Sequence, residues 1–254
     1  MTTPQTAEIV TGLSDFDALA GPIPRGQVTL VAARTSAGAS AFALSVARHN
    51  DETGHHVAIA SFQCGADQLM SDYVAATTSV NTDRPLTINK GRRARMERAR
   101  AAIGQSRLWM WDHRGNRSLE NLIKQVAALS NLDLLILDNY HLAASGELVP
   151  GATFTTLQKL ACERNIGLLV TAYLDLPADG SETDLPAITE LGTLSTPVAA
   201  AETVMFLHRP DRNGTVPQRR GEADLIAVRG WDAAGSATVR FEPEYHRFVD
   251  LPNT

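Results

Sequence analysis

The sequence lacks several features that would assign it to a specialised class of protein. Its 254 residues contain no apolar run of about 18 residues, so we expect no membrane-spanning helix. The first ten residues have neither the basic segment nor the apolar segment of a secretory signal, which predicts a cytoplasmic protein. Internal repeats, heptad runs and low-complexity tracts are also missing. With 44% hydrophobic residues, the chain is long enough for one large α/β domain.

Cysteine and positive charge are also scarce. The two cysteines, Cys64 and Cys162, have no metal-ligand spacing and lie among apolar residues, so we expect buried, reduced thiols. Only three lysines are present, and the net charge is −5. This balance does not favour wholesale adhesion to nucleic acid through net charge alone, so any polyanion site must be local. The histidines lack metal-ligand spacing and are expected to be incidental: His55, His56, His113, His141 and His208.

Apolar strand-like runs alternate with helical patterns, which predicts an α/β fold with a mostly parallel sheet between helices. Six strands are expected at 27–33, 56–62, 107–112, 132–138, 166–173 and 201–209. A closing antiparallel pair is expected at 222–229 and 236–251. Helices are expected near 40–50, 66–78, 92–103, 118–130 and 153–164. The stretch 174–200 is expected to be a long irregular loop of the kind that is often functional.

The stretch 28–50 has the pattern of a phosphate-binding loop, in which a strand, a small-residue turn and a helix follow one another. Such a loop holds phosphate with backbone N–H groups and a lysine, and binds magnesium through a Ser or Thr. Gly38 and Ser40 are in register, but Ala39 stands at the lysine position. The candidate phosphate-binding residues are Arg34, Thr35, Ser36, Ala37, Gly38, Ala39 and Ser40. Taken alone, the motif is also compatible with an ordinary turn between a strand and a helix.

A second candidate site residue follows the apolar run "LLILD", which ends on Asp138. In phosphate-loop proteins a carboxylate at this place orients magnesium through water. An Asp at a strand end is equally compatible with a turn or a helix cap. Ser40 and Asp138 are therefore the candidate magnesium residues, if a nucleotide binds.

These residues belong to a longer ordered series of motifs. The chain from about 11 to 251 resembles the RecA-like C-terminal motor domain of DnaB-type replicative DNA helicases. The resemblance implies a RecA-like P-loop NTPase fold with an antiparallel C-terminal extension, a short tail at 1–10 and a single domain at 11–254. The matching motifs are "TG" with Asp15 and Asp17, the phosphate loop, "SF" (61–62), "LLILDNYHL", "ITELGTL" (188–194), "VMFLHR" (204–209) and the final "TVRF".

The departures from that family concern residues that act on the phosphates. Gln63 stands where the resemblance implies a glutamate general base, and an amide does not take a proton from water. Tyr173 stands in place of a phosphate-sensing glutamine. The basic pair that would reach a neighbouring subunit's site corresponds to Arg229 and Trp231, so one cation remains. These departures predict that the nucleotide site is degenerate and has lost hydrolysis.

DNA binding is not expected from the loop at 174–190, where the resemblance implies basic residues that touch DNA. Here the loop is acidic, with no basic residue, and such a loop repels phosphate. A solvated surface loop is the favoured interpretation of its carboxylates: Asp175, Asp179, Glu182, Asp184 and Glu190. One basic cluster occurs in the helical stretch 88–107, for which a solvated face is favoured over contact with phosphate or an acidic partner. Its arginines are Arg92, Arg93, Arg95, Arg98 and Arg100.

The sequence therefore predicts a DnaB-type helicase homologue without the usual N-terminal domain and defective as an ATPase. We expect a weak nucleotide-binding or regulatory module in DNA replication or recombination, with ATP and Mg²⁺ as its cofactors or none. The expected partners are further copies of the chain or helicase-type proteins. No association with a membrane is expected. Two alternatives remain: an active ATP-dependent helicase that takes its cation from Arg34 or a neighbour's Arg229, and an interaction scaffold with a vestigial pocket.

Overall fold

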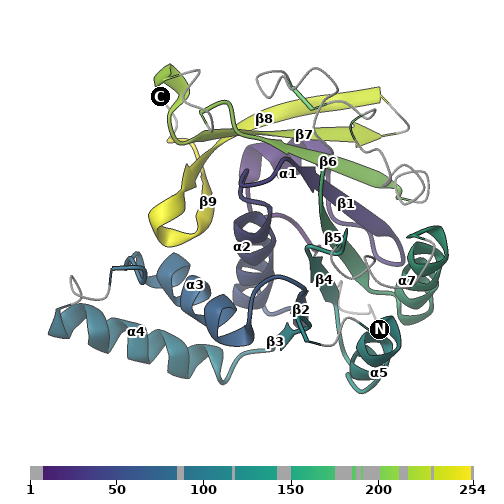
Figure 1. Ribbon diagram of the computed structural model, residues 1–254, viewed down its shortest axis with the longest axis horizontal. Coiled ribbons are helices and arrows are strands. Elements are labelled where there is room, and N and C mark those ends of the chain that lie inside the picture. Colours follow the sequence, from purple (N-terminus) through teal and green to yellow (C-terminus); the bar gives the residue numbers. More distant parts are fainter. Residues whose placement is uncertain are drawn as a thin grey trace, which may run out of the picture.

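One twisted sheet forms the centre of the molecule (Figure 1). The computed structural model describes residues 8–84, 89–115, 118–141, 150–174, 185–186, 190, 201–211, 217–229 and 232–252. Within these residues the sheet has nine strands in the order β3-β2-β4-β5-β1-β6-β7-β8-β9. The pairs from β3 to β6 are all parallel, and those from β6 to β9 are antiparallel. The predicted α/β class, the parallel sheet and its antiparallel C-terminal extension are confirmed.

The parallel strands coincide with the predicted apolar runs to within about two residues. They are β1 (Val28–Ala33), β2 (Val57–Ser61), β3 (Leu108–Asp112), β4 (Leu134–Asp138), β5 (Gly167–Tyr173) and β6 (Thr203–His208). All residues of β1, β2, β4 and β6 are buried. Strands covered on both faces by helices need apolar residues throughout, which is why continuous runs rather than alternation identified them.

The antiparallel part differs from the prediction in one respect. Strand β7 (Glu222–Arg229) lies where expected, but the run 236–251 is not one strand. It divides into β8 (Asp232–Glu242) and β9 (Arg247–Asp250), separated by the 3₁₀ turn η4 (Pro243–Tyr245). Pro243 cannot donate a ladder hydrogen bond, and His246 has the left-handed φ of 51° that reverses the chain. The β-branched and aromatic pattern did not reveal this reversal.

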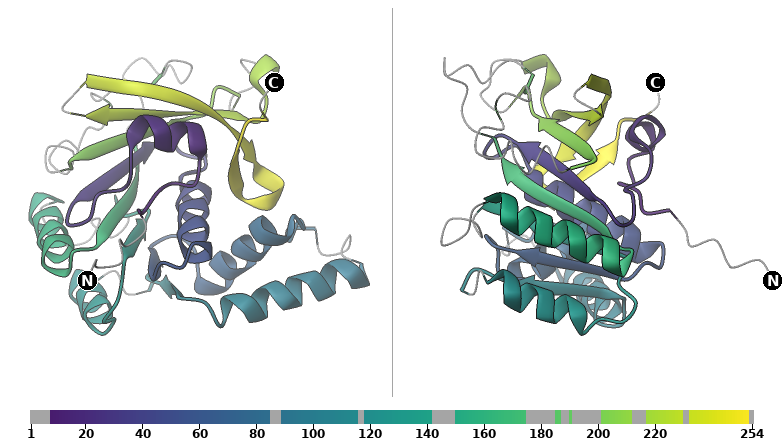
Figure 2. Two further views of the ribbon diagram at one scale, coloured as in Figure 1. Left: turned by 180° about the vertical axis from the view of Figure 1, so that it is seen from behind. Right: turned by 90° about the vertical axis from the view of Figure 1, so that its right-hand side faces the viewer.

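Helices cover the parallel part of the sheet on both faces, as the side view shows (Figure 2). On one face lie α2 (Ala39–Glu52) and α3 (Ala66–Thr78), and α4 (Lys90–Ile103) packs on the outside of α3. On the other face lie α5 (Leu119–Ala127) and α7 (Pro150–Arg164). Two apolar clusters follow from this layering, one on each face. None of the helices in the described ranges has the length and apolarity needed to cross a membrane.

The short helix α1 (Ser14–Ala20) was not predicted. Phe16 and Ala20 pack into the apolar core, and polar contacts at its start also stabilise it. The Asp17 carboxylate accepts hydrogen bonds from the Thr11 N–H, the Thr11 hydroxyl and the Gly12 N–H at 2.7–2.8 Å. Gly12 has a φ of 83°, and a Cβ there would lie 2.4 Å from the His49 ring. The motif of Thr11, Gly12 and Asp17 therefore fixes the turn that precedes α1. Ile9 is also buried in the core, so packed structure begins before Thr11.

The predicted burial of both cysteines was wrong. Cys162 is exposed and Cys64 is half-buried, and both are free thiols. Cys162 follows Ala161, which faces the core, and one step along a helix turns the next side chain outward. Partial burial raises the pKa of the Cys64 thiol.

Candidate functional site

The candidate site lies at the carboxyl ends of the parallel strands, where α/β folds bind ligands. Register brings its parts together, because Ala33 pairs with Tyr173 and Ser61 pairs with Asp138. The phosphate-like loop follows β1, Gln63 follows β2, and Asp138 ends β4. The sheet therefore gathers residues that are distant in the sequence, as the series of motifs predicted.

The loop from Arg34 to Ser40 has the backbone turn that its small residues allow. Ser36 and Gly38 have positive φ angles of 64° and 103°, and the Ala37 N–H donates to the Arg34 carbonyl at 3.0 Å. Helix α2 then begins at Ala39, with Gly38 as its N-cap. The first N–H groups of a helix have no intrahelical acceptor, and together with the helix dipole they favour an anion. Thr35 and Ser36 are exposed beside this helix end.

The lysine position of the loop is part of the hydrophobic core. Ala39 is 3% exposed and belongs to the same apolar cluster as Ala37. Behind the loop, a Cβ on Gly38 would lie 3.0 Å from the Phe248 ring and 3.5 Å from Phe241. The loop is therefore held in place by aromatic side chains from β8 and β9, and its residue 39 supplies no charge.

Arg34 is the loop's remaining cation, and it is engaged within the protein. Its Nη2 lies 2.9 Å from both Glu190 carboxylate oxygens, and its Nε lies 3.1 Å from one of them. The two side chains are 5% and 11% exposed. Such a two-point ion pair neutralises the guanidinium and fixes its direction. Glu190 was predicted to be a solvated loop residue, and this was wrong, because it is the carboxylate that balances buried Arg34.

Asp138 is fully buried and is surrounded by hydrogen-bond donors rather than by cations. Its Oδ1 accepts from the Thr171 hydroxyl at 3.0 Å, and its Oδ2 accepts from the Ser61 hydroxyl at 2.8 Å and the Asn139 amide at 3.2 Å. Burial raises the pKa of Asp138, and the hydrogen bonds from Ser61, Ser40, Thr171 and Asn139 oppose that rise. The carboxylate thus lies beside Ser40, as the phosphate-loop pattern requires.

Asn139 connects the Asp138 carboxylate to the loop. Its Nδ2 donates to Ser40 Oγ at 3.0 Å, and its backbone N–H donates to Thr171 Oγ1 at 2.8 Å. Its Oδ1 is buried and has no hydrogen-bond partner among the described residues. Ser40 Oγ, Asn139 Oδ1 and the Asp138 carboxylate are oxygen donors of the kind that Mg²⁺ prefers. These residues therefore fit a magnesium ion at the loop.

Gln63 is exposed at the mouth of the site and is held by Tyr173. The Tyr173 hydroxyl donates to Gln63 Oε1 at 2.9 Å, and the Tyr173 and His141 rings lie 4.5 Å apart. Burial raises the pKa of Tyr173 and lowers that of His141. His141 Nδ1 is buried without a partner in the described ranges. Gln63 stands at the general-base position and Tyr173 at the sensor position. The two side chains are in contact, and both are uncharged.

Arg229 lies away from the loop of its own chain. It is the last residue of β7, and its backbone pairs with Asp232. Because β7 runs antiparallel to β6, this end of β7 lies beside the start of β6, at the opposite edge of the sheet from Ser40. The backbone of Arg229 is therefore remote from the loop of its own chain. Trp231 lies outside the described residues.

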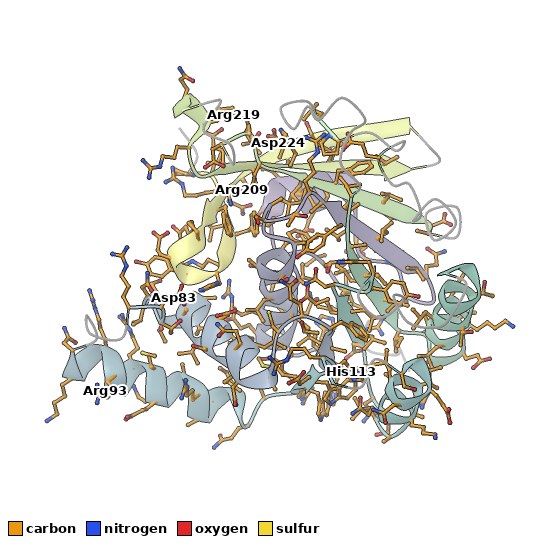
Figure 3. The ribbon with its side chains drawn as sticks, viewed as in Figure 1. Asp83, Arg93, His113, Arg209, Arg219 and Asp224 are labelled. Carbon is orange, nitrogen blue, oxygen red and sulfur yellow. The ribbon has the colours of Figure 1, made fainter. Side chains whose placement is uncertain are left out.

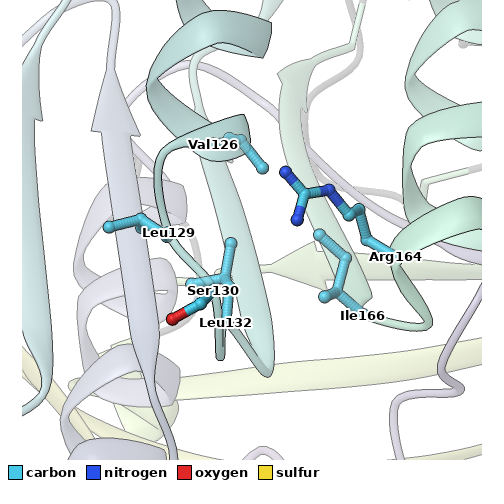
Figure 4. A pocket seen from close by; sticks show the side chains of 6 residues that line it. All are labelled: Val126, Leu129, Ser130, Leu132, Arg164 and Ile166. Carbon is cyan, nitrogen blue, oxygen red and sulfur yellow. The ribbon is translucent and has the colours of Figure 1, made fainter.

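Two hollows lie near the described surface. One of about 320 Å³ is lined by the start of α3 and by the Asp112–Arg114 ion pair, close to Gln63 in the sequence. The other, of about 20 Å³, holds no more than a water molecule or so and lies between the ends of α5 and α7 (Figure 4). It is at the amino ends of β4 and β5, far from the loop. The described residues contain no group of three or more His, Cys, Asp or Glu side chains suited to a metal ion.

Sequence reasoning missed three site features: Thr171, Asn139 and the ion-pairing role of Glu190. Thr171 is a polar residue within the apolar run of β5, and Asn139 directly follows Asp138. A polar residue inside a continuous apolar strand is a usable signal, because burial demands a hydrogen-bond partner. The pairing of Arg34 with Glu190 spans 156 residues and has no local signal.

Known proteins resemble this chain in sequence. The sequence model of the family described as "DnaB-like helicase C terminal domain" matches residues 8–250. The replicative DNA helicase DnaC of Bacillus subtilis (strain 168) is 24% identical over 256 residues, which cover 96% of this chain and 56% of that protein. The replicative DNA helicase DnaB of Leifsonia xyli subsp. xyli is 25% identical over 260 residues, with the same coverage. The chain thus spans about half the length of these relatives.

Solved structures are similar in fold. The structure of a separate ATPase domain superposes with a TM-score of 0.86 at 18% identity, covering 99% of this chain and 94% of that one. A DnaB-like replicative helicase, solved in a study of its interactions with primase, gives a TM-score of 0.84 at 19% identity, covering 97% and 62%. The RadB recombinase gives 0.62 at 16% identity, covering 96% and 100%. These likenesses show the RecA-like fold.

Proposed function

Since the chain belongs to the family of DnaB-like helicase C-terminal domains, we propose that it acts in DNA replication or recombination as a nucleotide-binding regulatory module without ATPase activity. The strongest support for this proposal comes from the two loop positions that could carry a positive charge, residues 34 and 39. Residue 39 is a buried alanine, and Arg34 is paired with Glu190. The cradle keeps its backbone N–H groups and its hydroxyl, while side-chain charge for the terminal phosphate is missing among the described loop residues.

The expected loss of nucleotide affinity is much smaller than the expected loss of hydrolysis rate. A charge-assisted hydrogen bond contributes about 1.5–3 kcal/mol, so loss of the lysine weakens triphosphate binding by about one to two decades. Loss of a general base lowers rates by about 10²–10⁴, and loss of a trans arginine lowers them by about 10³–10⁵. These defects do not multiply simply. Binding therefore survives in this proposal, and useful turnover does not.

The proposed ligand is ATP with Mg²⁺, held by the loop backbone and the oxygen donors around Ser40. Ser40 and Asp138 would hold the ion, and the Asn139 amide donates to both of them. When bound, the ion would supply charge neutralisation of the phosphates. Gln63 holds water near the terminal phosphate but has no basic atom to receive its proton.

Proposed partners follow from the family. Relatives include helicases of about twice this length. One similar structure is a DnaB-like replicative helicase that was solved in a study of its interactions with primase. We propose that this chain associates with further copies of itself or with helicase-type proteins, and that Arg229 faces a neighbouring molecule. The alternative of a working helicase that draws its cation from Arg34 is disfavoured by the Glu190 ion pair. DNA contact through the acidic loop at 174–190 is not part of this proposal.

A thermal-shift titration with Mg²⁺ and a non-hydrolysable ATP analogue tests nucleotide binding. A ligand at a hundred times its dissociation constant stabilises the folded state by about 2.7 kcal/mol, so we expect a rise in melting temperature at millimolar nucleotide. Ser40→Ala removes the proposed ligand oxygen and is expected to reduce that rise. Ser130→Ala, the same change at the opposite edge of the sheet, is the matched control. No shift in the unmodified protein would favour the scaffold alternative.

A further inference from the structure

Helix α4 is a projecting helix that carries a concentrated positive charge. It extends from the body in Figure 1 and in the left-hand view of Figure 2, with its amino-terminal end far from the sheet. Its sequence "KGRRARMERARAAI" contains six basic residues and one carboxylate, which gives a net charge of +5. Since the whole chain has a charge of −5, the remainder carries −10. Positive charge is therefore concentrated on this one helix.

Four arginines of α4 have no carboxylate partner in the described part of the chain, whereas seven arginines elsewhere have one. In the described part of the chain, no ion pair involves Arg93, Arg95, Arg98 or Arg100, and all four are exposed. Elsewhere, arginines pair with carboxylates at 2.6–3.0 Å: Arg25, Arg34, Arg48, Arg114, Arg209, Arg219 and Arg247. Figure 3 shows Arg93 at the outer margin of the molecule, on the projecting helix. The four guanidinium groups on α4 are therefore available to an external anion.

The packing of α4 leaves a wide part of its circumference exposed. Only Ile103 is buried, and Met96 and Ala99 are partly buried against the core cluster. The helix is held at its start by the Asn89 side chain, which accepts from the Arg92 N–H at 2.9 Å. Like charges one turn apart, such as Arg95 and Arg98, disfavour a helix slightly. The fold thus maintains a helix whose charges repel one another.

The arginines flank the exposed side of α4 on both edges. With 3.6 residues per turn, Arg93 and Arg100 lie on one edge, and Arg95 and Arg98 lie on the other. Between them, on the side opposite Met96, lie Lys90, the small residues Ala94 and Ala101, and the single carboxylate, Glu97. The helix therefore presents an exposed side of short and charged residues between two basic edges.

We propose that α4 is a binding element for duplex nucleic acid, with its two basic edges contacting the phosphates of both strands. The major groove of B-DNA, about 12 Å wide, admits an α-helix. Guanidinium groups bind phosphate in two-point geometry, and such contacts carry sequence-independent affinity. An acidic protein partner fits less well, because the exposed side has no large apolar or aromatic residue of the kind that anchors protein interfaces. The site is independent of the nucleotide cradle.

Fluorescence anisotropy with a short labelled duplex tests this proposal. We expect binding at about 50 mM salt, a slope of log K against log[salt] of about −3.5 for four contacts, and a fall in affinity of about 100-fold by about 200 mM salt. The doubles Arg93→Gln/Arg100→Gln and Arg95→Gln/Arg98→Gln are each expected to reduce the slope by about 2. Glu97→Gln removes a carboxylate from the groove-facing side and is expected to tighten binding several-fold.

The matched control is Lys124→Gln/Arg240→Gln, which removes the same charge from exposed positions on α5 and β8 and should leave the slope unchanged. Circular dichroism and melting of each variant check that the fold is retained. Three results would overturn the proposal: no duplex binding at low salt, doubles that bind with the parent slope, or equal competition by single strands of the same length. Self-association at low salt that the α4 doubles abolish, without duplex binding, would also overturn it and would assign the helix to a second copy of the chain.

Discussion

Asp138 occupies the expected position in the site, but its ionised carboxylate is costly for the stability of the fold because it is buried. The described hydrogen-bond donors to Asp138 are Ser40, Ser61, Thr171 and Asn139, which are all uncharged. Burial therefore raises its pKa. Without metal, the ionised form destabilises the fold, and a bound Mg²⁺ would reverse this effect.

Asp138→Asn tests that balance in a metal-free buffer. A raised folded pKa means that the native state holds its proton longer, so stability falls as pH rises from about 3.9 through the folded pKa. The variant lacks this loss, and its amide can still accept from Ser61 and donate to Thr171 Oγ1. We expect its melting temperature to equal or exceed that of the parent at about pH 8, with a smaller advantage at about pH 5.

Asp138→Ala is the contrasting change at the same position. It leaves the donors of Ser40, Ser61, Thr171 and Asn139 without this acceptor and is expected to lower stability by about 1–3 kcal/mol. An Asn variant that melts well below the parent at both pH values would mean that the charged carboxylate stabilises the apo protein.

At the scale of elements, the C-terminal strands β8 and β9 support the phosphate-like loop. Phe248 is stacked on Phe241 with ring centroids 4.6 Å apart, meets Phe42 edge-on at 6.0 Å, and its backbone N–H donates to Ser45 Oγ at 3.1 Å. This aromatic pair fills the space behind Gly38. The loop conformation therefore depends on residues about two hundred positions away in the sequence.

Phe248→Ala is expected to destabilise the protein by about 3–5 kcal/mol, because Phe248 is 2% exposed and the change leaves a cavity. Amide hydrogen exchange should also accelerate in the loop and the first turn of α2. Chemical denaturation and exchange measured together check both expectations. Tyr245→Ala, on the less buried turn η4, is the control and should change neither quantity greatly. A large loss of stability with unchanged exchange in the loop would contradict the proposed support.

The elements also show how far sequence patterns reach. Strands β1, β2, β4 and β5 were predictable because continuous apolar runs are what a doubly covered sheet requires. The break between β8 and β9 was not predictable, since it depends on Pro243 and His246. Helix α1 was not predictable either, because it is only seven residues long and packs on strands that are distant in the sequence. In the site, the loop and Asp138 were found from local motifs. The Arg34–Glu190 pair was not, because a contact across such a sequence distance is created by the fold alone.

At the scale of the whole molecule, one domain combines a shared architecture with an uneven distribution of charge. Residues 8–250 match a single family, and the chain spans about half of the length of the longer relatives. The body is acidic, its loop cation is paired inward, and a cluster of basic side chains projects on α4. In this account, interaction with nucleotide and interaction with nucleic acid belong to different parts of the molecule, and each is tested by separate variants.

Steady-state phosphate release from ATP by the purified chain, with Mg²⁺, tests the central claim most directly. We expect no release above background, with or without DNA, and a gain in the double variant Ala39→Lys/Gln63→Glu, which restores the lysine and the general base. Release by the unmodified protein that depends on Mg²⁺ and disappears in Asp138→Ala would contradict the account, because the catalysis would then arise in this cradle.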